Sequence, residues 1–532
     1  MPARSGASPS PCWWLLAGLI FASPASALDP PSGFLPRFDL DSGRSRVLPP
    51  EVDLIRFATH GEYQLRGQLQ SDPILQPPAA EPGAASLGQR GKILQWFRTT
   101  PRLQITTQAE IVGQIDLLRG LVTGATTRYM DAAAIPESRA NPLTIDPRWL
   151  YFELLRKIGR LRIGLQPVHQ GLGLLFDDGD HPTLFGDYQR GDSAVQGQFT
   201  LRPGGRTGQV ALWASGGAIF RDSWARLTEG DLAWQGMAGL TLGAETNQVG
   251  AWGALRSQRR REEARAVEHP LLERLDAQIL DVHGRFATKA PGANVYLFGE
   301  GEVALLRGEL QEYRSEPQRL LSWGTVLRLG IAHEAGAREE RFADAVVSVA
   351  WGNASGDNNP QDGTARRFAM HPNHNVGLVL FDHLLHVQTA RAATLARSIP
   401  AQERPPGFAL YPTNGGVAGA TYFNPTLVLR PGSRLDLKIG WVIAQATADL
   451  VDLYRLLGSG QRTNHLGGAP SQRNLGIELD GGLEWRYPLD FDMSLQLGVQ
   501  AGVLFPGEAF ENVMGAALAP QGLVISRVGF QY

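Results

Sequence analysis

The sequence predicts an all-β protein, a transmembrane antiparallel β-barrel of about 18 strands. Three observations predict this fold. The chain ends in an alternating strand, similar segments of ten or more residues recur along it, and short turns alternate with long polar connections. Successive side chains of a strand point to opposite faces, so each segment has one apolar and one polar face. A tilted strand needs about 9–11 residues to cross a bilayer, which is longer than most strands of soluble sheets.

The last segment shows the alternation clearly. Val524, Val528, Phe530 and Tyr532 fall on one face, whereas Arg527 falls on the other together with neutral residues. A closing strand that ends in an aromatic residue is typical of bacterial outer-membrane barrels. We therefore expect this strand, through Phe530 and Tyr532, to contact the barrel assembly machinery.

Four internal segments repeat the pattern, namely 61–70, 103–117, 472–487 and 493–505. In the third, Leu475, Ile477 and Leu479 share one face, and Glu478 and Asp480 share the other. Such segments predict lipid on the apolar face and water on the polar face.

Turn-rich joints separate these segments. Gly, Pro and Asn supply the backbone angles that turns need, and short joints occur at 100–102, 157–159, 202–205, 246–248, 290–292, 334–336, 430–433 and 487–490. Longer polar connections cover 72–91, 119–147, 174–191, 222–230, 261–272, 310–318, 354–416, 449–470 and 506–518. Short and long connections alternate, as periplasmic turns and extracellular loops do. An even strand number puts both ends of the barrel chain on the periplasmic side.

The N-terminus has the pattern of an export signal. Arg4 precedes the apolar run 13–22, and Ala25-Ser26-Ala27 follows as a cleavage pattern. We expect a signal peptide over 1–27, a periplasmic N-terminal tail over 28–50 and an outer-membrane β-barrel over 51–532. The only cysteine, Cys12, precedes the apolar run, so we expect no disulfide in the mature chain.

Composition excludes several classes of protein. The formal net charge of −2 argues against a nucleic-acid binder. No apolar stretch long enough for a transmembrane helix follows the signal, and the mean hydropathy is −0.16. Alternating strands give such a value because half of each strand is polar. The expected location is the bacterial outer membrane.

One long connection contains a predicted helix. The spacing of Leu380, Phe381, Leu384 and Leu385 within 376–397 indicates a short helix inside loop 354–416. This helix could fold over the mouth of the barrel. The alternative is a helix that packs the loop without a gating role.

Charges of both signs lie on the polar faces. An eighteen-stranded barrel leaves a water-filled lumen, and we expect most of these charges to pair across strands while a minority contacts solute. Arg66, Glu110 and Arg162 are the candidates for tuning selectivity. The predicted pore-lining residues are Arg66, Arg102, Glu110, Asp116, Glu153, Arg162, Gln166, Glu300, Glu302, Lys438, Glu478, Asp480, Glu484, Arg486 and Arg527.

Two loops carry groups that bind metals elsewhere. Asp177, Asp178, Asp180 and His181 form one cluster, for which a cation site and a solvated or constriction loop are both open; residues 357–362 allow the same alternatives. His383 and His386 would share a helix face, but no third zinc ligand has suitable spacing. No serine stands in a Gly-x-Ser-x-Gly context. We expect no catalytic residue, no metal and no cofactor.

Three runs resemble the alginate export family of outer-membrane barrels. These are residues 475–480 continuing to 502–507, residues 354–360 with Phe368 beyond them, and residues 159–166. The resemblance implies an eighteen-stranded barrel and passive passage of solute. Leu165 stands where the family usually has Arg, and the polar faces hold more carboxylates than basic groups. The fold therefore carries over better than a polyanionic substrate does.

The sequence favours a porin-like channel for passive passage of small polar solutes or of oligo- and polysaccharides. The alternative is a structural or binding surface barrel closed by the helix of loop 354–416. Expected partners are outer-membrane lipid, a polar solute or polysaccharide and the barrel assembly machinery, without nucleic acid.

Overall fold

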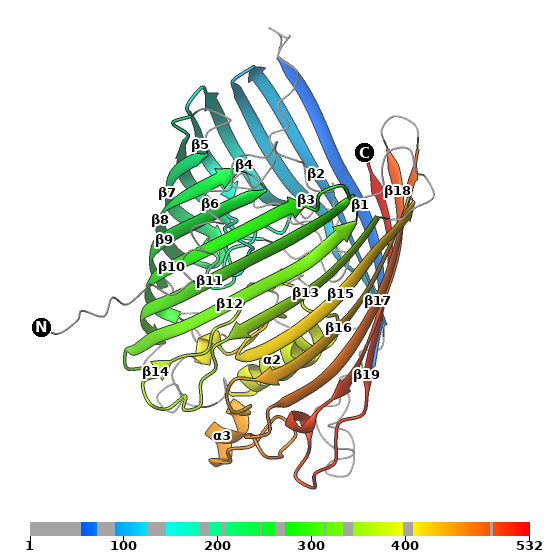
Figure 1. The fold of residues 1–532 in the computed structure, drawn as a ribbon. Helices are drawn as coiled ribbons and strands as arrows, with labels where there is room; N and C mark the ends of the chain where they lie inside the picture. Colours follow the sequence, from blue (N-terminus) through cyan, green and yellow to red (C-terminus); the bar gives the residue numbers. More distant parts are fainter. Residues whose placement is uncertain are drawn as a thin grey trace, which may run out of the picture.

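The chain folds into one closed antiparallel sheet (Figure 1). The computed structural model describes residues 55–71, 91–124, 145–180, 191–204, 209–244, 246–260, 272–312, 315–333, 344–396, 399, 408–432, 434–489 and 493–532. Of the 19 strands of the sheet, β14 (Thr364–Ala365) is only a two-residue parallel contact with β12 inside a loop. The other 18 form the barrel, which confirms the predicted fold and strand number. The predicted signal peptide and tail lie outside the described residues.

The strands have the following bounds. In the first half they are β1 (Arg56–Gln70), β2 (Gly91–Thr106), β3 (Ala109–Gly124), β4 (Ile145–Arg156), β5 (Gly159–Pro167), β6 (Ser193–Leu201), β7 (Val210–Arg221), β8 (Asp231–Ala244) and β9 (Asn247–Arg260). In the second half they are β10 (Leu272–Lys289), β11 (Val295–Glu312), β12 (Gln318–His333), β13 (Asp344–Ala354), β15 (Ala420–Gly432), β16 (Leu435–Ala446), β17 (Asn474–Pro488), β18 (Ser494–Pro506) and β19 (Gln521–Gln531).

The first and last strands close the barrel. Strand β1 pairs with β19 from Glu62↔Gln531 to Gln70↔Leu523. At the end of the chain, the backbone N–H groups of Gly61 and Tyr532 each donate to the other residue's carbonyl, both at 3.0 Å. Closure leaves no unpaired sheet edge, which a barrel in lipid requires.

The two faces of the sheet have opposite character, as the alternation predicts. Val524 and Val528 are 43% and 46% exposed on the outer face, whereas Ile525 and Arg527 of the same strand are 2% and 5% exposed. Leu475 is an exception, because it is buried rather than outward like Ile477. The backbone of Gly476 has φ +105°, and the β16–β17 register shifts beside it, which turns Leu475 inward.

One predicted turn is wrong. Residues 100–102 lie inside β2, and the β2–β3 connection is Thr107-Gln108. The ring of Pro101 packs over Gly113 of β3, where an added Cβ would lie 3.3 Å from its Cγ. Gly113 therefore leaves room for a proline within the sheet. The joints at 157–159, 246–248, 290–292 and 487–490 meet strand ends as predicted, while that at 334–336 lies outside the described residues.

The helices lie in the long connections. They are η2 (Leu227–Glu229), η4 (Leu380–Leu385), α2 (His386–Ala396), η6 (Phe408–Leu410), α3 (Leu453–Ser459) and η7 (Glu508–Phe510). The π-helix η4 and α2 confirm the helix predicted over 376–397, while α3 was not predicted. None of the helices in the described part of the chain is long and apolar enough to cross a bilayer.

The described parts of two long connections fold into the barrel. Residues 168–180 with 191–192 are called inner loop A, and residues 355–396, 399 and 408–419 are called inner loop B. Their apolar side chains, including Leu174, Phe176, Phe368, Leu380 and Phe381, form one buried cluster with inward residues of the wall. The α2 helix lies near the end of the barrel that carries the long connections, away from the C-terminus (Figure 1).

Candidate channel interior

Inner loop A is attached to the wall through a predicted pore-lining residue. The carboxylate of Glu302, on β11, accepts a hydrogen bond from the backbone N–H of Leu172. Gly171 has φ +61°, and an added Cβ there would lie 2.6 Å from the carboxylate of Glu302. Only glycine allows this close approach. The sequence predicted that Glu302 contacts lumen water. In the structure it contacts inner loop A instead, and it is 1% exposed.

Inner loop B has an equivalent attachment on β17. The carboxylate of Glu478 accepts hydrogen bonds from the backbone N–H groups of Leu378, Val379 and Leu380, the last two at 2.7 and 2.8 Å. These groups begin η4, where N–H groups have no partner within the helix. A carboxylate satisfies them and is favoured by the positive end of the helix dipole. Gly377, with φ +74°, again leaves room for the carboxylate.

The η4 helix of inner loop B also approaches β1. Burial raises the pKa of Asp382, in η4, to about 6, and the nearby guanidinium of Arg66 opposes that shift. Arg66 itself is fully buried. The helix therefore covers a wall residue that was predicted to tune selectivity.

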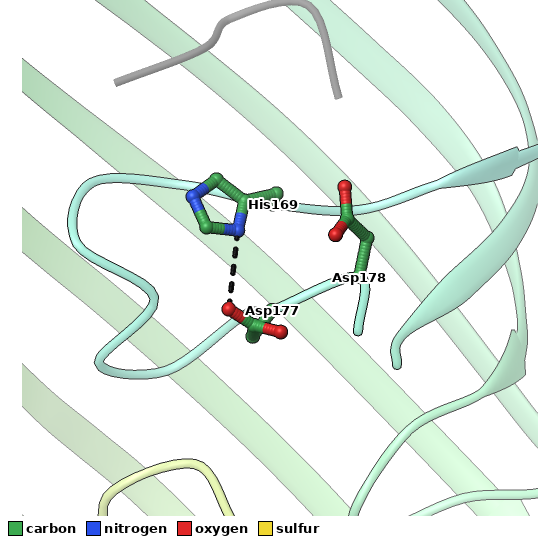
Figure 2. Close-up of side chains that lie close together, drawn as sticks. All are labelled: His169, Asp177 and Asp178. Carbon is green, nitrogen blue, oxygen red and sulfur yellow. Dashed lines mark ion pairs between the residues drawn. The ribbon is translucent and has the colours of Figure 1, made fainter. Parts of the chain in front are cut away.

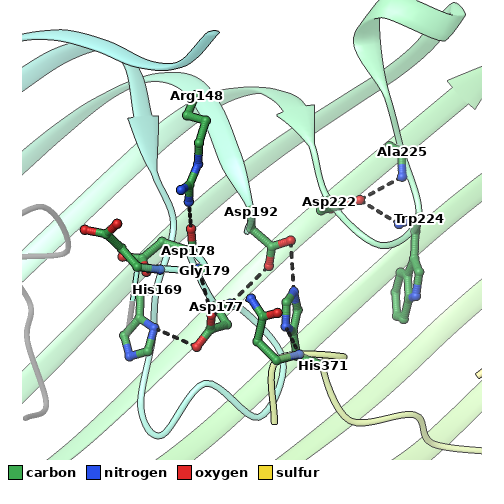
Figure 3. Close-up of polar contacts among 12 residues, drawn as sticks. Arg148, His169, Asp177, Asp178, Gly179, Asp192, Asp222, Trp224, Ala225 and His371 are labelled. Carbon is green, nitrogen blue, oxygen red and sulfur yellow. Dashed lines mark hydrogen bonds and ion pairs between the residues drawn. The ribbon is translucent and has the colours of Figure 1, made fainter. Parts of the chain in front are cut away.

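The two inner loops bind each other (Figure 3). Nε2 of His371 lies 3.3 Å from Oδ1 of Asp192. The side-chain amide of Asn373 donates to Asp177 at 2.8 Å, and the backbone N–H of His371 donates to the carbonyl of Leu174 at 2.8 Å. These contacts join loops that are about 180 residues apart in the chain, so the loops form one body.

The charges at this contact have shifted pKa values. Burial alone would lower the pKa of His371, but the carboxylate of Asp192 raises it above its ordinary value. Burial raises the pKa of Asp192 to about 6, against the lowering effect of His371. His374 differs, because burial lowers its pKa to about 4 and its Nε2 lies 2.9 Å from the hydroxyl of Tyr422.

One predicted acidic cluster is brought together in part. Donor atoms of His169, Asp177 and Asp178 lie within 4.8 Å of one another, and all three residues are buried (Figure 2). Nδ1 of His169 is 3.4 Å from Oδ2 of Asp177. Among the described residues, no such group includes His383 or His386. His181, of the predicted cluster, lies outside the described residues.

The carboxylates of this cluster also serve the fold of inner loop A. Asp177 accepts the backbone N–H of Gly179 at 2.8 Å, and Asp178 accepts that of Asp180 at 2.9 Å. Arg148 of β4 donates to the carbonyl of Asp178 (Figure 3). Because β4 and β11 lie on nearly opposite sides of the barrel, the contacts of Arg148 and Glu302 carry inner loop A across the lumen.

None of the predicted pore-lining residues is classed as exposed, because the inner loops and neighbouring side chains cover this face of the wall. Ten are buried, namely Arg66, Asp116, Glu153, Arg162, Gln166, Glu300, Glu302, Glu478, Asp480 and Arg527. Five are half-buried, namely Arg102, Glu110, Lys438, Glu484 and Arg486. Whether they contact solute stays a prediction.

Cross-strand ion pairs connect many of these charges. Arg98 pairs with Asp116 at 2.7 Å, and Arg162 pairs with Glu153. Arg328 pairs with Glu300 at 2.6 Å. The sequence interpretation missed Arg98, although its alternation with Arg102 on the same face would have identified it.

Charge is distributed unevenly around the inner wall. Arginines predominate on β1–β5, where the inward set comprises Arg66, Arg98, Arg102, Arg119, Arg148, Arg160 and Arg162. These seven arginines outnumber the five inward acids of the same strands, which are Glu62, Glu110, Asp116, Asp146 and Glu153. The facing strands β10 and β11 carry four buried carboxylates, Asp281, Glu300, Glu302 and Glu312, against one buried arginine, Arg285. The lumen therefore separates a mainly basic wall from a mainly acidic one.

A cavity opens between the inner loops and the wall. It encloses about 870 Å³, including space continuous with solvent, and Phe176, Trp224, Arg256 and Arg367 are among its lining residues. Arg256 pairs with Asp222. The same carboxylate accepts the backbone N–H groups of Trp224 and Ala225 (Figure 3). The cavity combines apolar surface with a few charged groups, as ligand sites do.

Fold and interior together define a class of protein. A closed sheet with an apolar outer face and a charged interior satisfies its backbone without water on the lipid side. Such a barrel, with short turns at one end and long loops at the other, is a transmembrane β-barrel of the bacterial outer-membrane type.

Comparison with known proteins gives likeness to solved structures alone. No family model matches the chain, and no curated protein matches it, so the resemblance to the alginate export family is not supported. The chain is similar to OccK9 (OpdG) of Pseudomonas aeruginosa, with 12% identity, TM-score 0.45 and coverage of 89% of this chain and 98% of that one.

Two further structures show the same degree of likeness. OccAB1 of Acinetobacter baumannii has 8% identity and TM-score 0.45, with 89% of this chain and 96% of that chain covered. OccK2 (OpdF) of Pseudomonas aeruginosa, solved in complex with glucuronate, has 9% identity and TM-score 0.44, with coverage of 89% and 98%.

Proposed function

We propose that the protein is an outer-membrane channel for passive diffusion of small polar solutes. The observation that supports this function is the opposed charge of the two inner walls, with arginines on β1–β5 and carboxylates on β10 and β11. A barrel whose only role is structural has no need for such a lining, since buried charges are costly to retain. Facing walls of opposite sign orient dipolar solutes and set ion preference.

The inner loops would define the selective part of this path. Inner loop A crosses the lumen between Arg148 and Glu302, and inner loop B covers Glu478 and Arg66. A solute would enter the cavity lined by Trp224 from the outside and then pass the charged walls beside these loops. The proposal includes no catalytic step.

Conductance tests the proposal directly. Purified full-length protein in planar bilayers is expected to give discrete current steps with a reproducible reversal potential under a salt gradient. Detergent without protein and heat-unfolded protein are the controls. Insertion of folded barrels that never conduct, at any voltage tested, would contradict the channel and favour a structural barrel closed by inner loop B.

The ends of the chain carry two further proposals. We infer that residues 1–27 are removed on export and that residues 28–50 remain as a periplasmic tail. The β19 strand, ending at Phe530 and Tyr532, is the segment proposed to contact the barrel assembly machinery. Substituting Phe530 with Ser is expected to lower the amount of assembled barrel in outer-membrane fractions, while a matched change at exposed Val513 leaves it unchanged.

A further inference from the structure

Four neighbouring strands carry arginines on the outside of the barrel. On β9–β12, which lie side by side (Figure 1), the outward residues toward the long connections include Arg259, Arg274, Arg307 and Arg319. These four residues are called the outer arginine patch. Elsewhere in the described strands, outward positions at this level are apolar, aromatic or neutral, as Val122, Ile145, Trp234 and Phe505 illustrate.

The patch begins directly beyond the apolar belt. Leu255, Leu280, Leu305 and Leu321 are the last apolar outward residues on the four strands and are 67%, 58%, 36% and 38% exposed. Arg307 and Arg319 lie two positions from Leu305 and Leu321, on the side of the long connections, which is about 7 Å along a strand. Arg307 and Arg319 therefore lie at the depth of lipid head groups, just outside the hydrocarbon, while Arg259 and Arg274 lie farther along their strands.

The aromatic residue Trp323 supports this depth. It is 44% exposed on the outer face of β12, between Leu321 and the rest of the belt. Trp and Tyr are enriched at membrane–water interfaces. A charged group two residues beyond that level meets head groups rather than acyl chains.

The four arginines of the patch outnumber the carboxylates beside them, which are Asp276, Glu273 and Glu309, so the patch keeps a formal charge of +1. Arg259 and Arg274 share one carboxylate, Asp276, at 3.0 and 2.6 Å. Arg307 donates to the neutral amide of Gln278 at 2.7 Å. Within the described residues, the Arg319 guanidinium has no ion pair, although Glu309 stands opposite it in the β11–β12 register. Arg307 and Arg319 therefore keep donors for an external anion.

We propose that the outer arginine patch binds the phosphate groups of a phosphorylated glycolipid in the outer leaflet. Guanidinium groups bind phosphate through paired hydrogen bonds, and the adjacent leucines supply a surface for acyl chains. The ligand therefore needs anionic groups directly beside its acyl chains, as a phosphorylated glycolipid has. This inference depends on the barrel lying in the outer membrane and not on its conducting.

Native mass spectrometry of the full-length protein in detergent tests the proposal. The probe is diphosphorylated lipid A, compared with the same glycolipid after removal of its phosphates. The wild type is expected to retain the phosphorylated form selectively. The double variant R307Q/R319Q should retain it at least about tenfold less, because each lost charge-assisted contact is worth about one order of magnitude.

A matched double variant controls for the loss of two exposed arginines. R56Q/R156Q changes exposed arginines at the first residue of β1 and the last residue of β4, at the end of the barrel opposite the patch. This variant should retain the lipid like the wild type. Circular dichroism establishes that each variant is folded. Equal retention by R307Q/R319Q and the wild type, or equal retention of the two lipids, would overturn the proposal. Both double variants should conduct normally, so a failure of the proposed channel would appear separately, as absence of current from the wild type.

Discussion

At the scale of single residues, Glu478 shows how one carboxylate positions a whole loop. It accepts three backbone N–H groups at the start of η4 and is fully buried. Substitution E478A would leave those donors unsatisfied at a cost of about 1–3 kcal/mol each. We expect inner loop B to detach, so that single-channel conductance rises and protease cuts within residues 355–419.

The amide variant of the same residue refines this test. E478Q retains one acceptor oxygen and should give an intermediate increase in conductance. E316Q, at an exposed carboxylate in the β11–β12 connection, is the control and should behave like the wild type. If E478A left both conductance and proteolysis unchanged, Glu478 would not be the attachment of inner loop B.

Arg162 carries the second residue-scale prediction. Its guanidinium pairs with Glu153 and lies 5.1 Å from the ring centre of Tyr151, both on β4. Substitution R162E reverses a charge on the mainly basic wall and is expected to shift ion preference toward cations. The reversal potential under a salt gradient measures this shift, with R156E at an exposed strand end as control. An unchanged reversal potential would place Arg162 outside the conduction path.

The sequence identified such residues only as members of an inward face. Alternation placed Glu302 and Glu478 on the polar side, and the structure agrees. Their partners could not be predicted, because a period of two gives the face and not the contact. Gly171 and Gly377 were the only local signals, since their positive φ values permit the close approach of each carboxylate. Without the fold, neither glycine can be linked to a residue that lies 101 or 131 positions away.

At the scale of elements, strands were easier to predict than connections. Long alternating runs indicated the strands because lipid and water select opposite faces. The turn at 107–108 was missed because Thr107-Gln108 contains no Gly, Pro or Asn, whereas Pro101 gave a false signal. The sequence did not decide whether inner loop A lies inside the barrel, since acidic residues suit both a solvated loop and a buried one.

The contact between the inner loops predicts a pH dependence. The pKa values of His371 and Asp192 are both raised, so the folded contact binds protons more tightly than the separated loops. Its stabilisation is therefore present at low pH and is lost as pH rises, first through about 6 for Asp192 and then through the raised pKa of His371. We expect opening of the loops, measured as channel open probability, to increase from pH 6 to pH 8.

The variant D192N isolates this effect. It removes the charge that raises the pKa of His371, so its open probability should change less over the same range. His374 has the opposite effect on the stability of the folded loops at acid pH, because its pKa is lowered. An open probability that falls as pH rises, or an equal dependence in D192N, would contradict the assignment.

At the scale of the whole molecule, the barrel and its contents are separable. The wall closes through β1–β19 pairing and through β13–β15 pairing across the base of inner loop B. None of these ladders uses residues of η4 or α2. The sheet should therefore form without the helix, whereas the occlusion of its lumen should not.

Deletion of residues 376–397, replaced by a short Gly-Ser linker, tests this separation. We expect a folded barrel, with a conductance several-fold above that of the wild type, because the deleted segment covers Arg66 and Glu478 on the inner wall. Deletion of residues 513–515, at an exposed loop tip where Val513 is 78% exposed, is the control and should leave conductance unchanged. Unaltered conductance after loss of the helix would mean that solute bypasses inner loop B. Failure of the deleted protein to assemble would instead show that the buried cluster around Phe381 is part of the barrel's own stability, since that cluster joins the helix to the wall.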